Sequence, residues 1–189
     1  MEYEHTKFNT VANYMNSLYF NYEYNNILFS FSSGVYDINH SKIQSDKYIS
    51  IGYRVIDKNY FISSYIGIKK ASTNQDISTT NDNKYISFEY DYYSNNFIYF
   101  IGWTYNITIP QDSNYINYIV GSSYIYKDFE FKLSYNNSGS LASTINEYNY
   151  MLFSTIKKID DNIYIKFGYN QNLDDNIYDL SFSIGVNFE

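Results

Sequence analysis

Cysteine is absent from this sequence, proline occurs once, at Pro110, and glycine only eight times among 189 residues. Without cysteine the chain can form no disulfide, no cysteine-based zinc site, no thiol nucleophile and no thiol redox centre. No stretch approaches the roughly 20 consecutive apolar residues that a membrane-spanning helix needs, which excludes a helical membrane protein. The sequence also has no glycine-rich phosphate loop and no metal-ligand spacing, so we expect no cofactor and no metal site.

Positive charge is also scarce. Thirteen basic residues stand against twenty acidic ones, and the net charge is −7. Because nucleic-acid binding draws most of its affinity from contacts between basic residues and phosphates, this balance argues against a nucleic-acid partner.

Aromatic residues are abundant instead. The chain has 26 tyrosines and 14 phenylalanines, and aromatics make up 22% of it. Disordered chains are poor in aromatics, so the sequence predicts a folded protein. The length favours one domain, and no linker or low-complexity tract divides it, so we expect a single domain over residues 1–189.

From Ser17 to the C-terminus, apolar and polar residues alternate with a period of two, which places the two sets on opposite faces of β-strands. The sequence is therefore expected to be all-β. Residues 5–19 are the exception: they allow either a helix, with apolar residues near a 3.6-residue spacing, or a weak first strand within residues 2–12. The eleven strand-like segments after Ser17 are 18–24, 27–38, 49–55, 62–68, 86–92, 97–107, 116–120, 129–135, 145–157, 163–169 and 178–188.

The connections between these segments alternate in length. Asn and Asp, which tolerate the left-handed conformations of tight hairpins, dominate the short ones. This alternation predicts one end of tight turns and one end of longer loops. The short connections lie at 25–26, 57–59, 94–96, 127–128 and 158–161, and the longer ones at 39–46, 71–83, 109–114, 137–144 and 171–176.

Eleven or twelve strands make a barrel too wide for side chains to fill, so the apolar face is expected to meet lipid and the polar face to enclose a lumen. We predict a closed antiparallel up-and-down transmembrane β-barrel of 12 strands, with 10 as the alternative. Aromatics at the strand ends should form two girdles around an aliphatic band. Towards the loops these are Tyr48, Tyr85, Tyr105, Tyr135, Tyr148, Tyr169 and Tyr178.

Small residues occupy the opposite, inward face. All glycines except Gly139 fall there, together with many serines. These glycines either relieve strand curvature or leave room in a lumen, and both interpretations fit a barrel.

The strand–turn–strand–loop rhythm over residues 17–189, with the closing segment Tyr178–Phe188, resembles bacterial outer-membrane β-barrel proteins of the porin-like kind. The aromatic Phe188 stands one residue before the end, whereas these proteins usually end in an aromatic. The resemblance implies a Gram-negative outer membrane, a lipid bilayer and lipopolysaccharide around the barrel, and recognition of the C-terminal strand by the assembly machinery. It also implies periplasmic turns and termini. Met1 is followed by no signal peptide, so we expect a mature chain; the oligomeric state stays open.

Several charged residues have inward parity, and both signs are present, with a slight acidic excess that would favour cations weakly. Such a wall either fills a narrow barrel with ion pairs or lines a water-filled pore. The expected lumen-lining residues, which include the sole arginine, are Arg54, Lys69, Glu89, Asp91, Glu130, Lys132, Lys166 and Asp179.

The leading hypothesis is a narrow passive channel for ions or small polar solutes. The alternative is a structural or adhesion barrel with a filled lumen, whose loops, especially 71–83, bind a partner. A third is a soluble lipocalin-like barrel that binds a ligand in an apolar interior. His5 and His40 are the two histidines, and no nucleophile or paired acid and base accompanies them, so no catalytic residue and no enzyme are predicted.

Overall fold

The computed structural model describes residues 1–8, 14–38, 41–71, 82–109, 114–140, 148–174 and 177–187. Among these residues there is no helix that could cross a membrane. The elements assigned in them are the strands β1 (Glu2–Phe8), β2 (Tyr14–Tyr24), β3 (Ile27–Ile38), β4 (Ser41–Gln44), β5 (Lys47–Asp57), β6 (Tyr60–Lys70), β7 (Asp82–Ser94), β8 (Phe97–Ile109), β9 (Tyr115–Tyr126), β10 (Phe129–Ser140), β11 (Tyr148–Lys158), β12 (Ile163–Asn172) and β13 (Tyr178–Val186).

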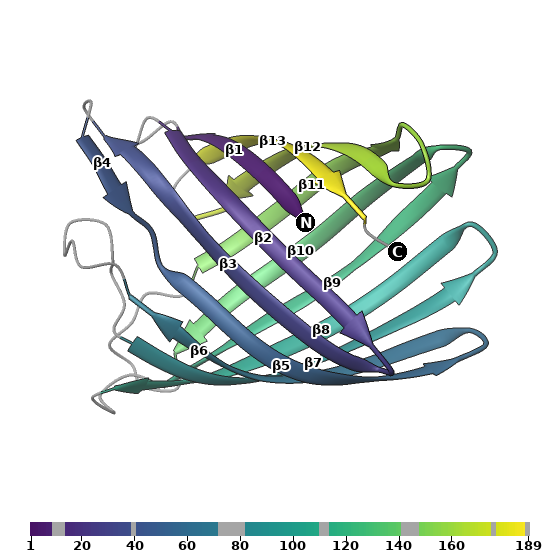
Figure 1. Ribbon diagram of the computed structural model, residues 1–189, viewed down its shortest axis with the longest axis horizontal. Helices are drawn as coiled ribbons and strands as arrows, with labels where there is room; N and C mark the ends of the chain where they lie inside the picture. The colour runs from purple at the N-terminus through teal and green to yellow at the C-terminus, as the bar shows by residue number, and fades with distance from the viewer. Residues whose placement is uncertain are drawn as a thin grey trace.

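These strands form one closed antiparallel sheet (Figure 1). Strand β3 pairs with β4 through Val35–Ile38 and with β5 through Ile27–Ser32. Segments β4 and β5 are therefore two parts of one strand, interrupted at Ser45 and Asp46, and the Ser45 amide still donates to the Gly34 carbonyl at 2.9 Å. Counted this way the barrel has 12 strands, which confirms the predicted number and excludes ten.

The N-terminal segment closes the barrel. Strand β1 lies between β2 and β13, with Glu2 opposite Tyr19 on one side and Gly185 on the other. The helix considered for residues 5–19 is therefore wrong for the described part of this segment. A strand prevails because pairing on both sides satisfies the backbone groups of β1 and removes two free sheet edges. The Met1 ammonium also donates to the Val186 carbonyl at 2.8 Å.

Tight turns gather at one end of the barrel, as the alternating connection lengths predict (Figure 1). Asn25 and Asn26 both have positive φ, 47° and 66°, as a two-residue hairpin of the primed type requires. Lys127 also has a positive φ of 54°, so here the hairpin imposes a backbone conformation that its residue does not favour.

Three of the expected long connections are shorter than the sequence indicates. Segment 39–46 contains β4, while segments 137–144 and 171–176 begin inside β10 and β12. Their polar residues continue the sheet because the neighbouring strand supplies hydrogen-bond partners there, so a polar composition did not mark a loop. Most of segment 71–83, namely 72–81, lies outside the described residues.

The two faces of the sheet differ sharply in chemistry. Ile66, Phe167 and Val120 expose 60%, 60% and 49% of their surface, whereas Leu28 is the buried hydrophobic residue of the described chain. The most buried side chains are polar, with Ser183 at 0% and Asn83 at 1%. Such an exterior needs hydrocarbon around it, so the expected orientation is confirmed and the soluble lipocalin-like barrel is wrong.

Many outward aromatics lie near the strand ends and contact each other, whereas Phe167 and Phe182 pair in the middle of β12 and β13. The ring centroids of Phe97 and Tyr124 are 5.0 Å apart at the turn end, and the ring centroids of Tyr169 and Tyr178 are 6.1 Å apart towards the loop end. Three expected girdle residues are exceptions, and one of them, Tyr148, pairs with Ser138 in the inward register of β10 and β11. Tyr48 and Tyr85 share the register of the inward residues Lys69 and Gly67 and line an interior cavity. Their position near a strand end predicted a girdle, but their parity decides the face.

The lipid-facing exterior makes a testable prediction for Ile66, near the middle of β6. Replacement Ile66→Lys should lower the free energy of unfolding in lipid by about 2–4 kcal/mol, because a charge then faces hydrocarbon. Asn21→Lys places the same side chain on the inward, exposed side of β2 and should cost far less. Urea titration in liposomes measures both, and equal losses would contradict the orientation.

Candidate channel lumen

Four inward glycines face an aromatic ring on the neighbouring strand. The directly opposed pairs are Gly52–Tyr65, Gly67–Tyr85, Gly121–Phe100 and Gly185–Tyr164. A Cβ on any of these glycines would overlap the facing ring; at Gly52 it would lie 2.5 Å from Tyr65 Cδ1.

None of the described glycines has a positive φ, so space rather than backbone conformation explains these residues. Each aromatic side chain lies over its glycine, an arrangement that also protects the thinly covered backbone. The aromatic rings therefore pack along the wall, and the middle of the barrel keeps its room.

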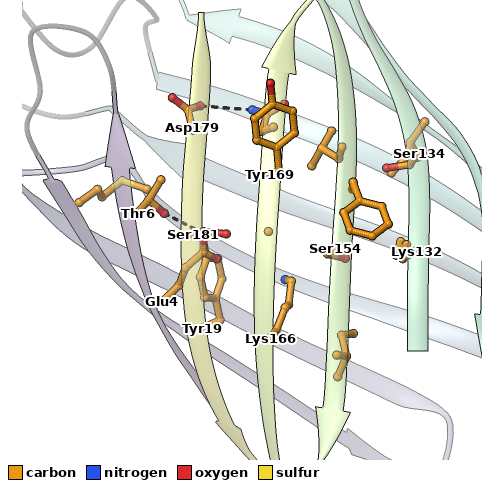
Figure 2. A pocket seen from close by; sticks show the side chains of 17 residues that line it. Glu4, Thr6, Tyr19, Lys132, Ser134, Ser154, Lys166, Tyr169, Asp179 and Ser181 are labelled. Carbon is orange, nitrogen blue, oxygen red and sulfur yellow. Dashed lines mark hydrogen bonds between the residues drawn. The ribbon is translucent and has the colours of Figure 1, made fainter. Parts of the chain in front are cut away.

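The interior contains a series of cavities that share lining residues. Near the loop end a cavity of about 240 Å³ is bordered by Asp46 and Tyr19. Tyr19 also borders a cavity of about 440 Å³ (Figure 2), and Lys166 links this one to a cavity of about 230 Å³ that reaches Asp160 at the turn end. The three cavities thus follow one another from the loop end to the turn end.

Charged side chains dominate the turn half of the lumen. Arg54 Nη1 lies 2.7 Å from Glu23 Oε2, and Arg54 Nε donates to Ser63 Oγ at 3.0 Å. Where the two ends of the chain meet in the sheet, Lys166 Nζ is 3.4 Å from Glu2 Oε1, while the Tyr164 hydroxyl donates to Glu2 Oε2 at 2.7 Å. These contacts tie β2 to β5 and β1 to β12, although neither pair of strands is adjacent in the sheet.

The loop half of the lumen is rich in hydroxyl and amide groups. Lys69 is 4% exposed and lies 3.2 Å from Asp46. Near it, Asn83 Nδ2 donates to the Tyr115 hydroxyl at 2.9 Å. Tyr48 borders two of the cavities in this half. This half therefore offers hydrogen-bonding groups with little net charge.

The structure places the expected lumen residues as follows. Lys132, Lys166 and Asp179 line the 440 Å³ cavity, and Asp179 accepts from Asn170 Nδ2 at 3.3 Å (Figure 2). Glu89 lines two further cavities, and Glu130 lines the turn-end cavity. The remaining three are located by register or ion pair: Arg54 opposite Ser63, Asp91 two residues beyond Glu89 on β7, and Lys69 beside Asp46.

Sequence reasoning missed two groups of inward residues. Glu2 and Glu4 were overlooked because the segment that carries them had no settled secondary structure, and only its pairing with β13 fixes their face. The inward tyrosines were missed because tyrosine was taken as a girdle residue. Alternation with the serines of the same strand, for example Ser17 before Tyr19, could have revealed them.

Among the described residues no group of His, Asp and Glu side chains could hold a metal ion. His5 shares a hydrogen bond with Asn16 Oδ1, with 2.8 Å between Nδ1 and the oxygen. His40 lies outside the described residues. That the chain is not an enzyme stays a prediction from the sequence.

No family model matches the chain, and no curated protein matches it. Several solved structures match the chain. "KdgM porin" superposes with a TM-score of 0.73 at 10% identity, and "KdgM porin in complex with disordered oligogalacturonate" with 0.71 at 11%; each match covers 100% of this chain and 98% of the other. Outer-membrane expressed OmpT of Vibrio cholerae gives 0.51 at 7% identity, over 99% of this chain and 95% of that one. The chain therefore has the fold of porin-like outer-membrane β-barrels.

The glycine–aromatic pairs predict a specific energetic coupling. At Gly185 all three close contacts of an added Cβ are with the Tyr164 ring, so Gly185→Ala should destabilise the barrel by about 1–3 kcal/mol through overpacking. In a Tyr164→Ala background the same change should cost much less, and a double-mutant cycle of unfolding free energies measures this difference.

Gly102→Ala is the matched control for this cycle. The nearest contact of its added Cβ is 3.0 Å, to Ile119 Cγ2, so its cost should be smaller than that of Gly185→Ala. Additive effects of Gly185→Ala and Tyr164→Ala would show that the ring does not require the glycine.

Proposed function

We propose that the protein is a narrow passive channel for ions or small polar solutes in a bacterial outer membrane, with the turns and both termini on the periplasmic side. The observation that carries this proposal is the succession of interior cavities, in which Tyr19 and Lys166 are shared between neighbours. Since each of these cavities has polar side chains in its lining, water and small solutes would find hydrogen-bonding partners along the succession.

Solvent exposure inside the barrel supports the same proposal. Glu89 and Asn21 point inward by register, yet both are exposed. A lumen filled by its own side chains would bury them. The similar structures named as porins have this fold, and their low identity limits the comparison to the fold.

The alternative, a structural or adhesion barrel, draws support from the bulky inward residues Phe100, Ile119 and Leu152, which narrow the lumen beside the cavities. Its expected partner-binding segment falls mainly on residues 72–81, outside the described part of the chain. Lipopolysaccharide and the assembly machinery remain proposed partners on the basis of the fold.

Planar-bilayer recording separates a channel from a filled barrel. Protein refolded in detergent, with its closed barrel verified by heat-modifiable gel mobility, should give stepwise currents in KCl. A verified barrel that never conducts would exclude the channel.

Tyr19 offers a sharper test because it borders three interior cavities. Tyr19→Ala should raise the single-channel conductance by removing a ring from the path. Phe20→Ala, which changes the outward neighbour on the same strand, should leave the conductance unchanged. Equal conductance in the Tyr19 variant and the parent would contradict a path past this residue.

A further inference from the structure

Three of the interior cations are each neutralised by a carboxylate at the wall. Arg54 pairs with Glu23, Lys69 with Asp46 and Lys166 with Glu2, at 2.7, 3.2 and 3.4 Å. The Arg54 guanidinium carbon also lies 5.8 Å from the centroid of the Phe61 ring, which keeps it close to β6. These six groups contribute local order and almost no net field in the lumen.

The inward charges outside these pairs are mostly negative. Lys132 and Lys158 are the inward cations of the described strands that belong to none of these pairs, and Lys132 Nζ lies over the Phe100 ring at 4.2 Å from the centroid. At the turn-end mouth, Lys158 stands with Asp160 and Asp161. The inward carboxylates of the described strands that belong to none of the three pairs are Glu4, Glu89, Asp91, Glu130 and Asp179.

Glu89 is the most accessible of these carboxylates to a solute. It is exposed although it points inward, and it borders two cavities that meet at Ser87 and Glu89. Asp91 follows on the same face of β7, opposite Phe61 and Phe100. Glu89 thus borders a cavity that shares Tyr19 with the proposed path, Asp91 lies two residues further along the same inward face, and neither carboxylate has an ion pair among the described residues.

We infer that this channel selects cations and rejects anionic solutes, and that Glu89 and Asp91 set this selectivity. The inference rests on the proposed channel function and specifies its solute class. A lumen enclosed by low-dielectric walls concentrates the field of its fixed charges, and carboxylates on the wall favour cations. A polyanion such as the oligogalacturonate named with one similar porin would meet repulsion on this wall.

The test is the reversal potential across a planar bilayer under a KCl gradient. A mean lumen potential of only about one kT per elementary charge would already favour K⁺ over Cl⁻ roughly sevenfold. The reversal potential of the parent protein should therefore lie towards the equilibrium potential of K⁺. The double variant Glu89→Gln/Asp91→Asn should move the reversal potential towards zero, and Lys132→Gln should move it the opposite way. Asp128→Asn removes one charge in the turn between β9 and β10 and should have little effect.

The outcomes distinguish the two proposals. A heat-modifiable barrel without conductance overturns both. Conductance with no preference, or with a preference for Cl⁻, overturns the cation inference and leaves the channel standing. Cation selectivity that survives Glu89→Gln/Asp91→Asn overturns the role of these two residues. If the double variant does not fold, the parent protein and Lys132→Gln still decide the sign of the selectivity.

Discussion

Backbone hydrogen bonding imposes the constraint on which the rest of this structure depends. In hydrocarbon no water is available to pair with a free amide or carbonyl, so a sheet that crosses a bilayer has to close on itself. Here the closure depends on β1, which joins β13 to β2. The same segment brings Glu2 within reach of Tyr164 and Lys166, so the seam of the barrel also becomes part of its charged lumen.

Once the sheet is closed, the width of the lumen depends on how large inward side chains are accommodated. Glycines directly opposite Tyr65, Tyr85, Phe100 and Tyr164 let these rings lie along the wall. The two interpretations of the inward glycines thereby merge: the missing Cβ makes room for a ring on the next strand, and this keeps the centre open. Cation–carboxylate pairs also keep the centre open, because they hold the long charged side chains near the wall.

The comparisons show the fold of this chain, and the chemistry of the lumen has to be taken from its own inward residues. At 10–11% identity, two KdgM porin structures superpose over the whole chain, so the architecture tolerates almost complete replacement of the sequence. The described wall of this chain combines tyrosine and serine hydroxyls in the loop half with an excess of carboxylates in the turn half, and solute selection would follow from that pattern.

The sequence by itself determined the all-β fold, the eleven strands after Ser17, the positions of the short turns and the face that meets lipid, because a period of two and the Asn-rich turns are local signals. It also gave the inward parity of residues such as Lys132 and Lys166. Only the tertiary structure decided that residues 2–8 form a strand, that Tyr48 and Tyr85 turn inward, and which charges neutralise one another. Arg54 and Glu23, for example, lie 31 residues apart on strands that are not neighbours. Such contacts depend on the stagger and closure of the barrel, and these are properties of the whole sheet rather than of any one segment.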